Sequence, residues 1–308
     1  MSEEYPKDVF VSLEELLQMS RYAKGFSFRA RKQKVRSILA GKYASKLRGR
    51  GMDFEEVRQY VPGDDIRNID WKVTARTQKT HSKVFTEEKE KPVLIVVDQS
   101  KSMFFGSVKK TKSVVAAELA AMIAFKIQKE GDRVGGLIFT DQGADAVLPK
   151  RNKKNTLKLL ERIVHHNHNL KQNASGDRSV ALREAISKLR NIVTHDFLIV
   201  VISDFVYYSD EVVKNLSRLA QHNDVLLAKV FDPIERKIPR EKMIVGDGNH
   251  QIMVDGQRKK VSEKFTAGFD QDLTDFETKM KKFRIPLIRM NTIDPVDEQI
   301  KRAFNSHE

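Results

Sequence analysis

From residue 92 to the C-terminus, short apolar runs alternate with longer segments in which apolar residues recur at helical spacing. Uninterrupted apolar runs are typical of parallel strands buried on both faces, and their alternation with helices is typical of α/β folds. We therefore expect a doubly wound, mostly parallel sheet with helices on both sides. The expected strands are Val93–Val97, Arg133–Phe139, Phe197–Ile202, Val225–Phe231 and Ile285–Met290, and the expected helices are 109–129, 154–166, 179–192, 210–222, 261–283 and 295–304.

The sequence before residue 91 has a different character, because its apolar residues are scattered. A helix is expected within Val11–Ala23, where Ser12 and Glu15 have the spacing of a capping box. A basic segment and a stretch rich in turn signals follow. We therefore divide the chain into an N-terminal region, 1–90, and an α/β domain, 91–308, with a hairpin insertion near 243–256.

Carboxylate and hydroxyl side chains follow two of the expected strands. The first strand runs into Asp98, Ser100 and Ser102, and a later strand ends at Ser203-Asp204. In open α/β sheets, ligands bind beyond the carboxyl ends of the strands where the strand order reverses. Magnesium prefers oxygen ligands in octahedral geometry. The pattern therefore predicts an Mg²⁺ or Mn²⁺ site at Asp98, Ser100, Ser102 and Asp204. The alternative is structural: the serines cap the next helix while Asp98 accepts backbone hydrogen bonds.

Such a site has a functional consequence. Serine hydroxyls carry no charge, so they leave the metal electron-poor and able to accept a carboxylate from another molecule. We therefore expect a metal-dependent protein-binding module without a catalytic residue, not an enzyme.

Charge and composition bear on the partners. The 308 residues include 56 basic and 42 acidic ones, a net charge of +14, which suits an acidic protein surface, anionic lipid or nucleic acid. No acidic residue interrupts the basic stretch from Arg21 to Arg50, and we take Arg29, Arg31 and Lys32 within it as candidate partner-binding residues.

Several classes of protein and site are excluded or disfavoured. The absence of cysteine excludes disulfides and thiolate chemistry. Apolar runs such as Phe197–Ile202 are too short for a membrane span, and the N-terminus does not have the pattern of a secretory signal. We therefore expect no membrane span and a cytoplasmic location.

A long motif in the N-terminal half carries a family resemblance. The stretch GRGMDFEEVRQYVPGDDIRNIDWK, residues 49–72, followed by Thr74-Ala-Arg-Thr77, resembles the signature of domain-of-unknown-function family 58. The resemblance implies a von Willebrand factor A-like domain whose metal-ion-dependent adhesion site uses Asp98, Ser100, Ser102 and Asp204. It also implies an accessory role beside a MoxR-type AAA ATPase in protein or cofactor maturation.

The chain departs from the resembled pattern in two respects. An adhesion site of this type also uses a threonine, and here Ser179 or Ser175 stands in the corresponding stretch. Many relatives begin with two membrane spans, which this sequence lacks. The charged residues of the motif are interpreted as a polar network that supports the sheet edge, with a docking surface as the alternative.

Three further functions have less support in the sequence. A phosphatase of the haloacid dehalogenase type needs an aspartate two positions after Asp98 as general acid, but position 100 is serine. The segment Gly106–Ser113 differs from a phosphate-binding loop at Thr111. Nucleic-acid binding is the alternative from a different class, and it is supported only by the net charge and the basic run 21–50, without an aromatic stacking pattern or a recognised motif.

Overall fold

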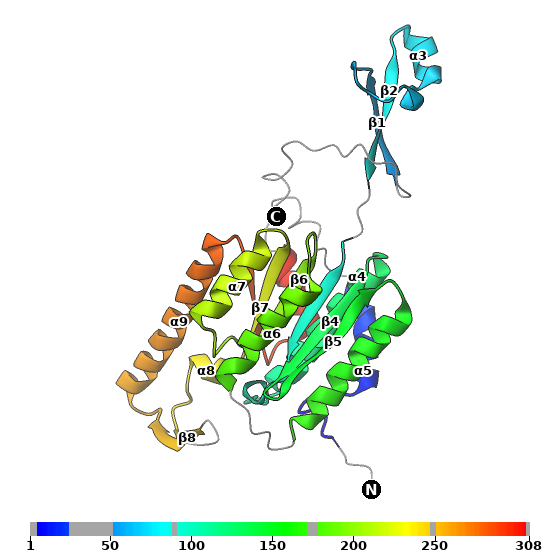
Figure 1. Cartoon of the computed structure of the whole chain (residues 1–308). Coiled ribbons are helices and arrows are strands. Elements are labelled where there is room, and N and C mark those ends of the chain that lie inside the picture. Colours follow the sequence, from blue (N-terminus) through cyan, green and yellow to red (C-terminus); the bar gives the residue numbers. More distant parts are fainter. Residues whose placement is uncertain (1–4, 25–51, 88–90, 172–177, 247–250, 306–308) are drawn as a thin grey trace. The chain divides into compact units, whose positions relative to one another are not determined.

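The computed structural model describes residues 5–24, 52–87, 91–171, 178–246 and 251–305 (Figure 1). These residues form two compact units. The first contains the described residues up to Lys24 together with those from Lys91 onward, and the second is described from Met52 to Glu87.

A six-stranded sheet forms the centre of the first unit (Figure 1). Its order is β10-β7-β6-β3-β4-β5, and every neighbouring pair is parallel except β4 and β5, which are antiparallel. The strands are β3 (Val93–Asp98), β4 (Val134–Thr140), β5 (Gly143–Lys150), β6 (Leu198–Ser203), β7 (Asp224–Phe231) and β10 (Leu287–Asn291). The expected α/β fold with a doubly wound, mostly parallel sheet is therefore confirmed.

Helices cover both faces of this sheet and bury two separate apolar cores. The first core contains side chains of α1, α4, α5 and α10, and the second those of α6, α7 and α9. Successive side chains of a strand point to opposite faces. Accordingly Val93, Ile95 and Val97 enter the first core, while Leu94 and Val96 enter the second. The helices are α4 (Lys112–Lys129), α5 (Lys153–Asn169), α6 (Arg178–Ile192), α7 (Asp210–Ala220), α9 (Lys259–Lys282) and α10 (Val296–Asn305).

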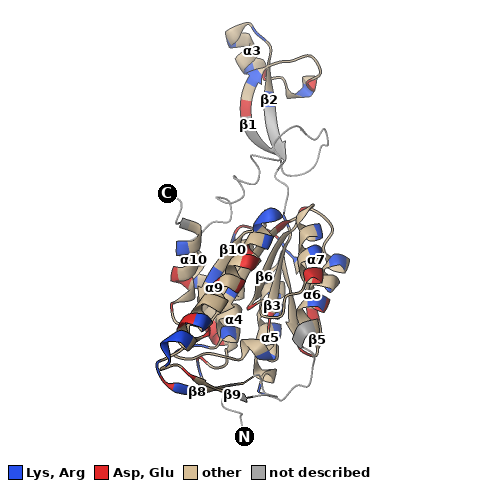
Figure 2. Ribbon diagram, turned by 90° about the vertical axis from the view of Figure 1, so that its left-hand side faces the viewer, with Lys and Arg blue, Asp and Glu red and all other residues tan. Residues whose placement is uncertain are grey.

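Charged side chains lie mainly on the outer helices. Figure 2 shows Lys, Arg, Asp and Glu spread over α6, α7, α9 and α10, whereas β3 and β6 carry few of them. This distribution fits a sheet whose central strands are buried on both faces.

All five expected strands and all six expected helices are present, with ends that differ from the expected ones by up to three residues. Two differences have a clear physical reason. Strand β5 was not expected, because GADAVLPK is a half-exposed edge segment without a continuous apolar run. Helix α4 begins at Lys112 and not near residue 109, because the Thr111 hydroxyl accepts the Val114 N–H as an N-cap. The expected hairpin is present as β8 (Lys242–Gly246) and β9 (Gln251–Asp255).

The N-terminal segment belongs with the large sheet. Helix α1 (Leu13–Gln18) begins with the expected capping box, since Ser12 and Glu15 exchange hydrogen bonds. It continues as the 3-10 helix η1 (Met19–Lys24), and Leu16 enters the first core beside α4. The Val11 N–H donates to Asn167 Oδ1 over 2.9 Å. These contacts place residues 5–24 in the first unit, which differs from the division at residue 90 expected from the sequence.

The second unit is a two-stranded antiparallel sheet with short helices between its strands. Strands β1 (Met52–Gln59) and β2 (His81–Glu87) pair with each other, and the 3-10 helix η2 (Ile66–Asn68) and helix α3 (Trp71–Thr77) lie between them in sequence. Throughout the described parts of the chain, the structure contains no helix with the length and apolar character of a membrane span.

Candidate metal centre

The candidate site lies where the strand order of the sheet reverses. Strand β3 has β4 on one side and β6 on the other. The chain after β3 leads to α4 in the first core, whereas the chain after β6 leads to α7 in the second core. The two connections therefore diverge to opposite faces, and the carboxyl ends of β3 and β6 border the place where α/β sheets bind ligands.

The structure brings the two expected carboxylates to this place. Asp98 ends β3 and Asp204 follows β6, and each residue is only 3% exposed. One Asp98 oxygen, Oδ2, accepts the Ser203 hydroxyl over 2.6 Å, and Oδ1 accepts the Ser100 N–H over 2.9 Å. The end of β6 is thus hydrogen-bonded directly to the end of β3.

The serine hydroxyls belong to the same cluster. Ser100 precedes the 3-10 helix η3 (Lys101–Met103), but its hydroxyl makes no capping hydrogen bond. Ser100 Oγ instead lies within hydrogen-bond distance, 3.2 Å, of Ser102 Oγ. Asp98 therefore accepts a backbone N–H, as expected if the loop were purely structural. The Ser100 hydroxyl does not cap the helix, although that interpretation requires it.

A small hollow lies between these groups. It is lined by Asp98, Ser100, Ser102 and Asp204, among others, and measures about 10 Å³. A hollow of this size holds about one water molecule. The space suits a single ion or water and excludes an organic cofactor.

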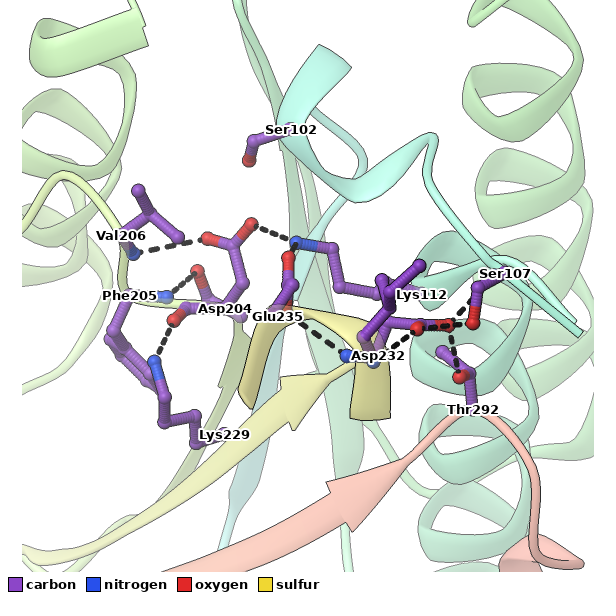
Figure 3. A network of polar contacts seen from close by, with 12 residues as sticks. Ser102, Ser107, Lys112, Asp204, Phe205, Val206, Lys229, Asp232, Glu235 and Thr292 are labelled. Carbon is purple, nitrogen blue, oxygen red and sulfur yellow. Dashed lines mark hydrogen bonds and ion pairs between the residues drawn. The ribbon is translucent and has the colours of Figure 1, made fainter. Parts of the chain in front are cut away.

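A buried lysine, not expected from the sequence, completes the cluster (Figure 3). Lys112, in the first turn of α4, is 2% exposed, and its Nζ donates to Asp204 Oδ2 over 2.8 Å. The same ammonium donates over 2.6 Å to Glu235 in the short helix α8 (Pro233–Arg236). Lys112 therefore joins the end of β6 to the segment that follows β7.

A third buried carboxylate, after those of Asp98 and Asp204, fixes that segment. Asp232 is fully buried and accepts the Ser107 hydroxyl and the Thr292 hydroxyl, over 2.5 and 2.6 Å (Figure 3). It also accepts the backbone N–H groups of Ser107 and Ile234 over 2.8 and 2.9 Å. Asp232 thereby holds α8 in position, with Glu235 facing Lys112.

The electrostatics of the two candidate carboxylates differ. Burial, and next the negative charge of Asp204, raise the pKa of Asp98 above its ordinary value, although hydrogen bonds from Ser100 and Ser203 oppose this. Burial alone would also raise the pKa of Asp204, but the charge and hydrogen bond of Lys112 outweigh it and lower that pKa. Asp204 is therefore held as the anion by the lysine.

Two further side chains support the loops around the site. The Lys229 ammonium donates to the Asp204 carbonyl oxygen, and burial lowers the pKa of Lys229. Asp141, after β4, accepts over 2.7 Å the backbone N–H of Lys101, which lies between Ser100 and Ser102. Both side chains hold backbone in place around the candidate metal ligands.

The donors fit a hard divalent cation with one qualification. Two carboxylates and two hydroxyls are all-oxygen ligands of the kind that Mg²⁺ and Mn²⁺ accept. Across the described residues, no three His, Asp or Glu side chains gather as a metal cluster, so these mixed donors are the candidate. The qualification is that one Asp204 oxygen already faces the Lys112 ammonium.

The remaining expected residues are not placed at the site. Ser179 lies in the first turn of α6, but its side chain is outside the described structure. Arg29, Arg31 and Lys32 lie outside the described residues. Sequence reasoning missed Lys112, Asp232 and Glu235. The signal available for Lys112 was a lysine that opens an otherwise apolar, alanine-rich helix.

Solved structures similar to this chain include BatB from Bacteroides thetaiotaomicron, with 18% identity, a TM-score of 0.44, and coverage of 70% of this chain and 97% of that one. An aerotolerance-related membrane protein from Bacteroides fragilis has 20% identity and a TM-score of 0.46, over 70% and 96% of the two chains. The SpRpn10 VWA domain has 13% identity and a TM-score of 0.40, over 69% and 94%.

The chain also matches known protein sequences and the model of one protein family. Uncharacterized proteins of Mycobacterium tuberculosis and Mycobacterium bovis are each 32% identical to this chain over 208 residues, which is 68% of this chain. The chain spans 64% of the length of these relatives, somewhat less than two thirds. The model of the family described as "Protein of unknown function DUF58" matches residues 56–273. The chain belongs to the DUF58 family.

Proposed function

We propose that this chain is a protein-binding module that holds Mg²⁺ or Mn²⁺ at Ser100, Ser102, Asp98 and Asp204, with Ser179 as a further hydroxyl ligand. The metal takes one acidic side chain of a partner protein as its remaining ligand. One observation carries the proposal: two buried carboxylates and two hydroxyls surround a hollow for one small ion where the sheet order reverses.

Binding without catalysis is the chemistry that these residues support best. Neutral hydroxyl ligands leave the metal able to attract a carboxylate, and Lys112 further reduces the negative charge around it. Ser100 stands where a phosphatase of the dehalogenase type needs a general acid. We therefore assign no catalytic residue.

The proposed partner is a MoxR-type AAA ATPase, as the family resemblance implies, and the proposed setting is protein or cofactor maturation in the cytoplasm. The net charge of +14 supports an acidic surface on that partner, and Arg29, Arg31 and Lys32 are proposed to speed the encounter. Charges at the rim of an interface act mainly on the association rate, whereas a coordinating carboxylate acts on dissociation.

Replacing one hydroxyl ligand is expected to weaken the metal site. Ser100→Ala should lower the affinity for Mn²⁺ by about 10- to 100-fold, because one oxygen that contacts the metal is lost. Changes in residues that only hydrogen-bond to a metal ligand already have effects of that size. Titration calorimetry measures the affinity directly. Ser217→Ala is the matched control, because the Ser217 hydroxyl donates only to the Lys214 carbonyl on the surface helix α7. Equal affinities for both variants would remove Ser100 from the site.

Partner binding is expected to depend on the metal through the dissociation rate. With the purified ATPase at constant ionic strength, EDTA and Ser100→Ala should each speed dissociation about tenfold or more, while reversing the charges of Arg29, Arg31 and Lys32 slows association. Surface-bound kinetics separates the two rates. A dissociation rate that ignores both EDTA and Ser100→Ala contradicts metal-mediated docking.

A further inference from the structure

The second unit exposes large apolar side chains in the segment that joins β1 to α3. Val61 is 52% exposed, Ile66 67% and Trp71 70%. We call these three side chains the tip surface. All three belong to the motif of residues 49–77, for which the candidate metal centre provides no role.

Three carboxylates of the same motif accept hydrogen bonds within the unit. Asp64 accepts Arg58 Nη2 over 2.7 Å and the Val61 N–H over 3.0 Å. Asp65 caps η2, and Asp70 caps α3 by accepting the N–H groups of Lys72 and Val73. The carboxylates therefore fix the backbone from which the apolar side chains project. A surface held in this way loses little conformational freedom when a partner binds.

The side chains that the structure describes in this unit form little apolar interior. Among its described side chains only Ser82 is buried. A two-stranded hairpin of this size is marginally stable unless further surface covers it. Exposed apolar surface on a soluble protein is typical of interaction sites. The tip surface therefore has the composition of a site that a partner covers.

The charges around the tip surface indicate the kind of partner. Asp64 pairs with Arg58, Asp65 with Arg67 at 3.5 Å, and Asp70 with Lys83 at 3.6 Å. The exposed Lys72, Arg76 and Lys79 make no ion pair with any residue that the structure describes. Glu56 in β1 is the one exposed carboxylate of the described unit for which the structure shows no ion pair. Three unpaired cations thus stand against one anion, so the excess charge is positive and favours an acidic surface over a second copy of this unit.

We propose that the tip surface docks an acidic protein that offers an apolar pocket to Trp71, with Lys72, Arg76 and Lys79 contacting the acidic rim of that pocket. Tryptophan in a well-packed pocket is a common source of binding energy at interfaces. The site uses no metal ligand. It stands whether or not the metal-centred proposal holds.

The test uses the fluorescence of the full chain, because Trp71 is its only tryptophan. A random copolymer of glutamate and tyrosine serves as the acidic and apolar probe, with polyglutamate and duplex DNA as comparisons, all in EDTA. We expect the copolymer to shift the Trp71 emission to shorter wavelength in a saturable way. We expect Ile66→Ser and the double change Lys72→Glu, Arg76→Glu each to weaken this binding about tenfold. Met253→Ser, at a residue 69% exposed in β9, should leave it unchanged.

Four results would each overturn the proposal. Equal binding of polyglutamate would reduce the site to charge alone, and tighter binding of duplex DNA would make it a nucleic-acid site. Free protein whose emission is already that of a buried indole would mean that other parts of this chain cover the surface. An Ile66→Ser variant with unchanged affinity would remove the apolar contact.

Discussion

Lys112→Met is expected to destabilise the metal-free protein by about 3–5 kcal/mol, because it leaves the buried carboxylate of Asp204 and the part-buried carboxylate of Glu235 without their cation. Methionine keeps most of the side-chain volume, so the loss reports the charge and not a cavity. Chemical denaturation in EDTA measures the change. Lys188→Met, at an exposed residue of α6, removes the same charge and should change the stability by less than about 0.5 kcal/mol.

The same variant tests how the lysine relates to the metal. A cation bound to the native state stabilises it by about 2.7 kcal/mol when its concentration is 100 times the dissociation constant. Removing the Lys112 ammonium removes a positive charge beside Asp204, so Mn²⁺ should bind the variant more tightly and restore part of the lost stability. A Lys112→Met protein as stable as the wild type in EDTA would contradict the role of Lys112 as the counter-ion.

Asp232→Ala is expected to destabilise the protein by about 3 kcal/mol. The change leaves the buried Thr292 hydroxyl and the part-buried N–H groups of Ser107 and Ile234 without their acceptor, and a buried donor without a partner costs about 1–3 kcal/mol. Asp232→Asn keeps one acceptor oxygen and should lose clearly less. Asp272→Ala, on the exposed side of α9, is the control for charge.

Thermal and chemical unfolding of the three variants measure this ranking. Asp232→Ala should also loosen α8, so that exchange of its amide hydrogens becomes faster than in Asp272→Ala. An alanine variant that is no less stable than the asparagine variant would mean that the hydrogen bonds to Asp232 contribute nothing net.

The sequence predicts the site carboxylates because of where they occur. Asp98 and Asp204 directly follow fully apolar strands, and parallel strands end at one edge of the sheet. Lys112 could not be recognised in the same way, since a lysine in the first turn of a helix is normally solvated. Its ammonium is paired with Glu235, which lies 123 positions further along the chain and is near Lys112 only in the folded sheet.

The motif of residues 49–77 illustrates a different limit. Its many charged residues led us to expect a polar network that supports the sheet edge. The network is present, but its carboxylates cap local turns and helices within the second unit. Composition identifies such residues as hydrogen-bonding partners without distinguishing a local cap from a long-range contact, and it does not indicate that Trp71 remains exposed.

The second unit is connected to the first at both of its ends. The described chain leaves the first unit at Lys24 and returns to it at Lys91, so the hairpin unit is an insertion that is attached at both ends. A double attachment confines an inserted unit more than a single linker does, and it raises the effective concentration of anything that the unit holds. A protein bound to the inserted unit therefore remains tethered to the first unit. When it dissociates from the first unit it can bind there again, without any contact between the two units.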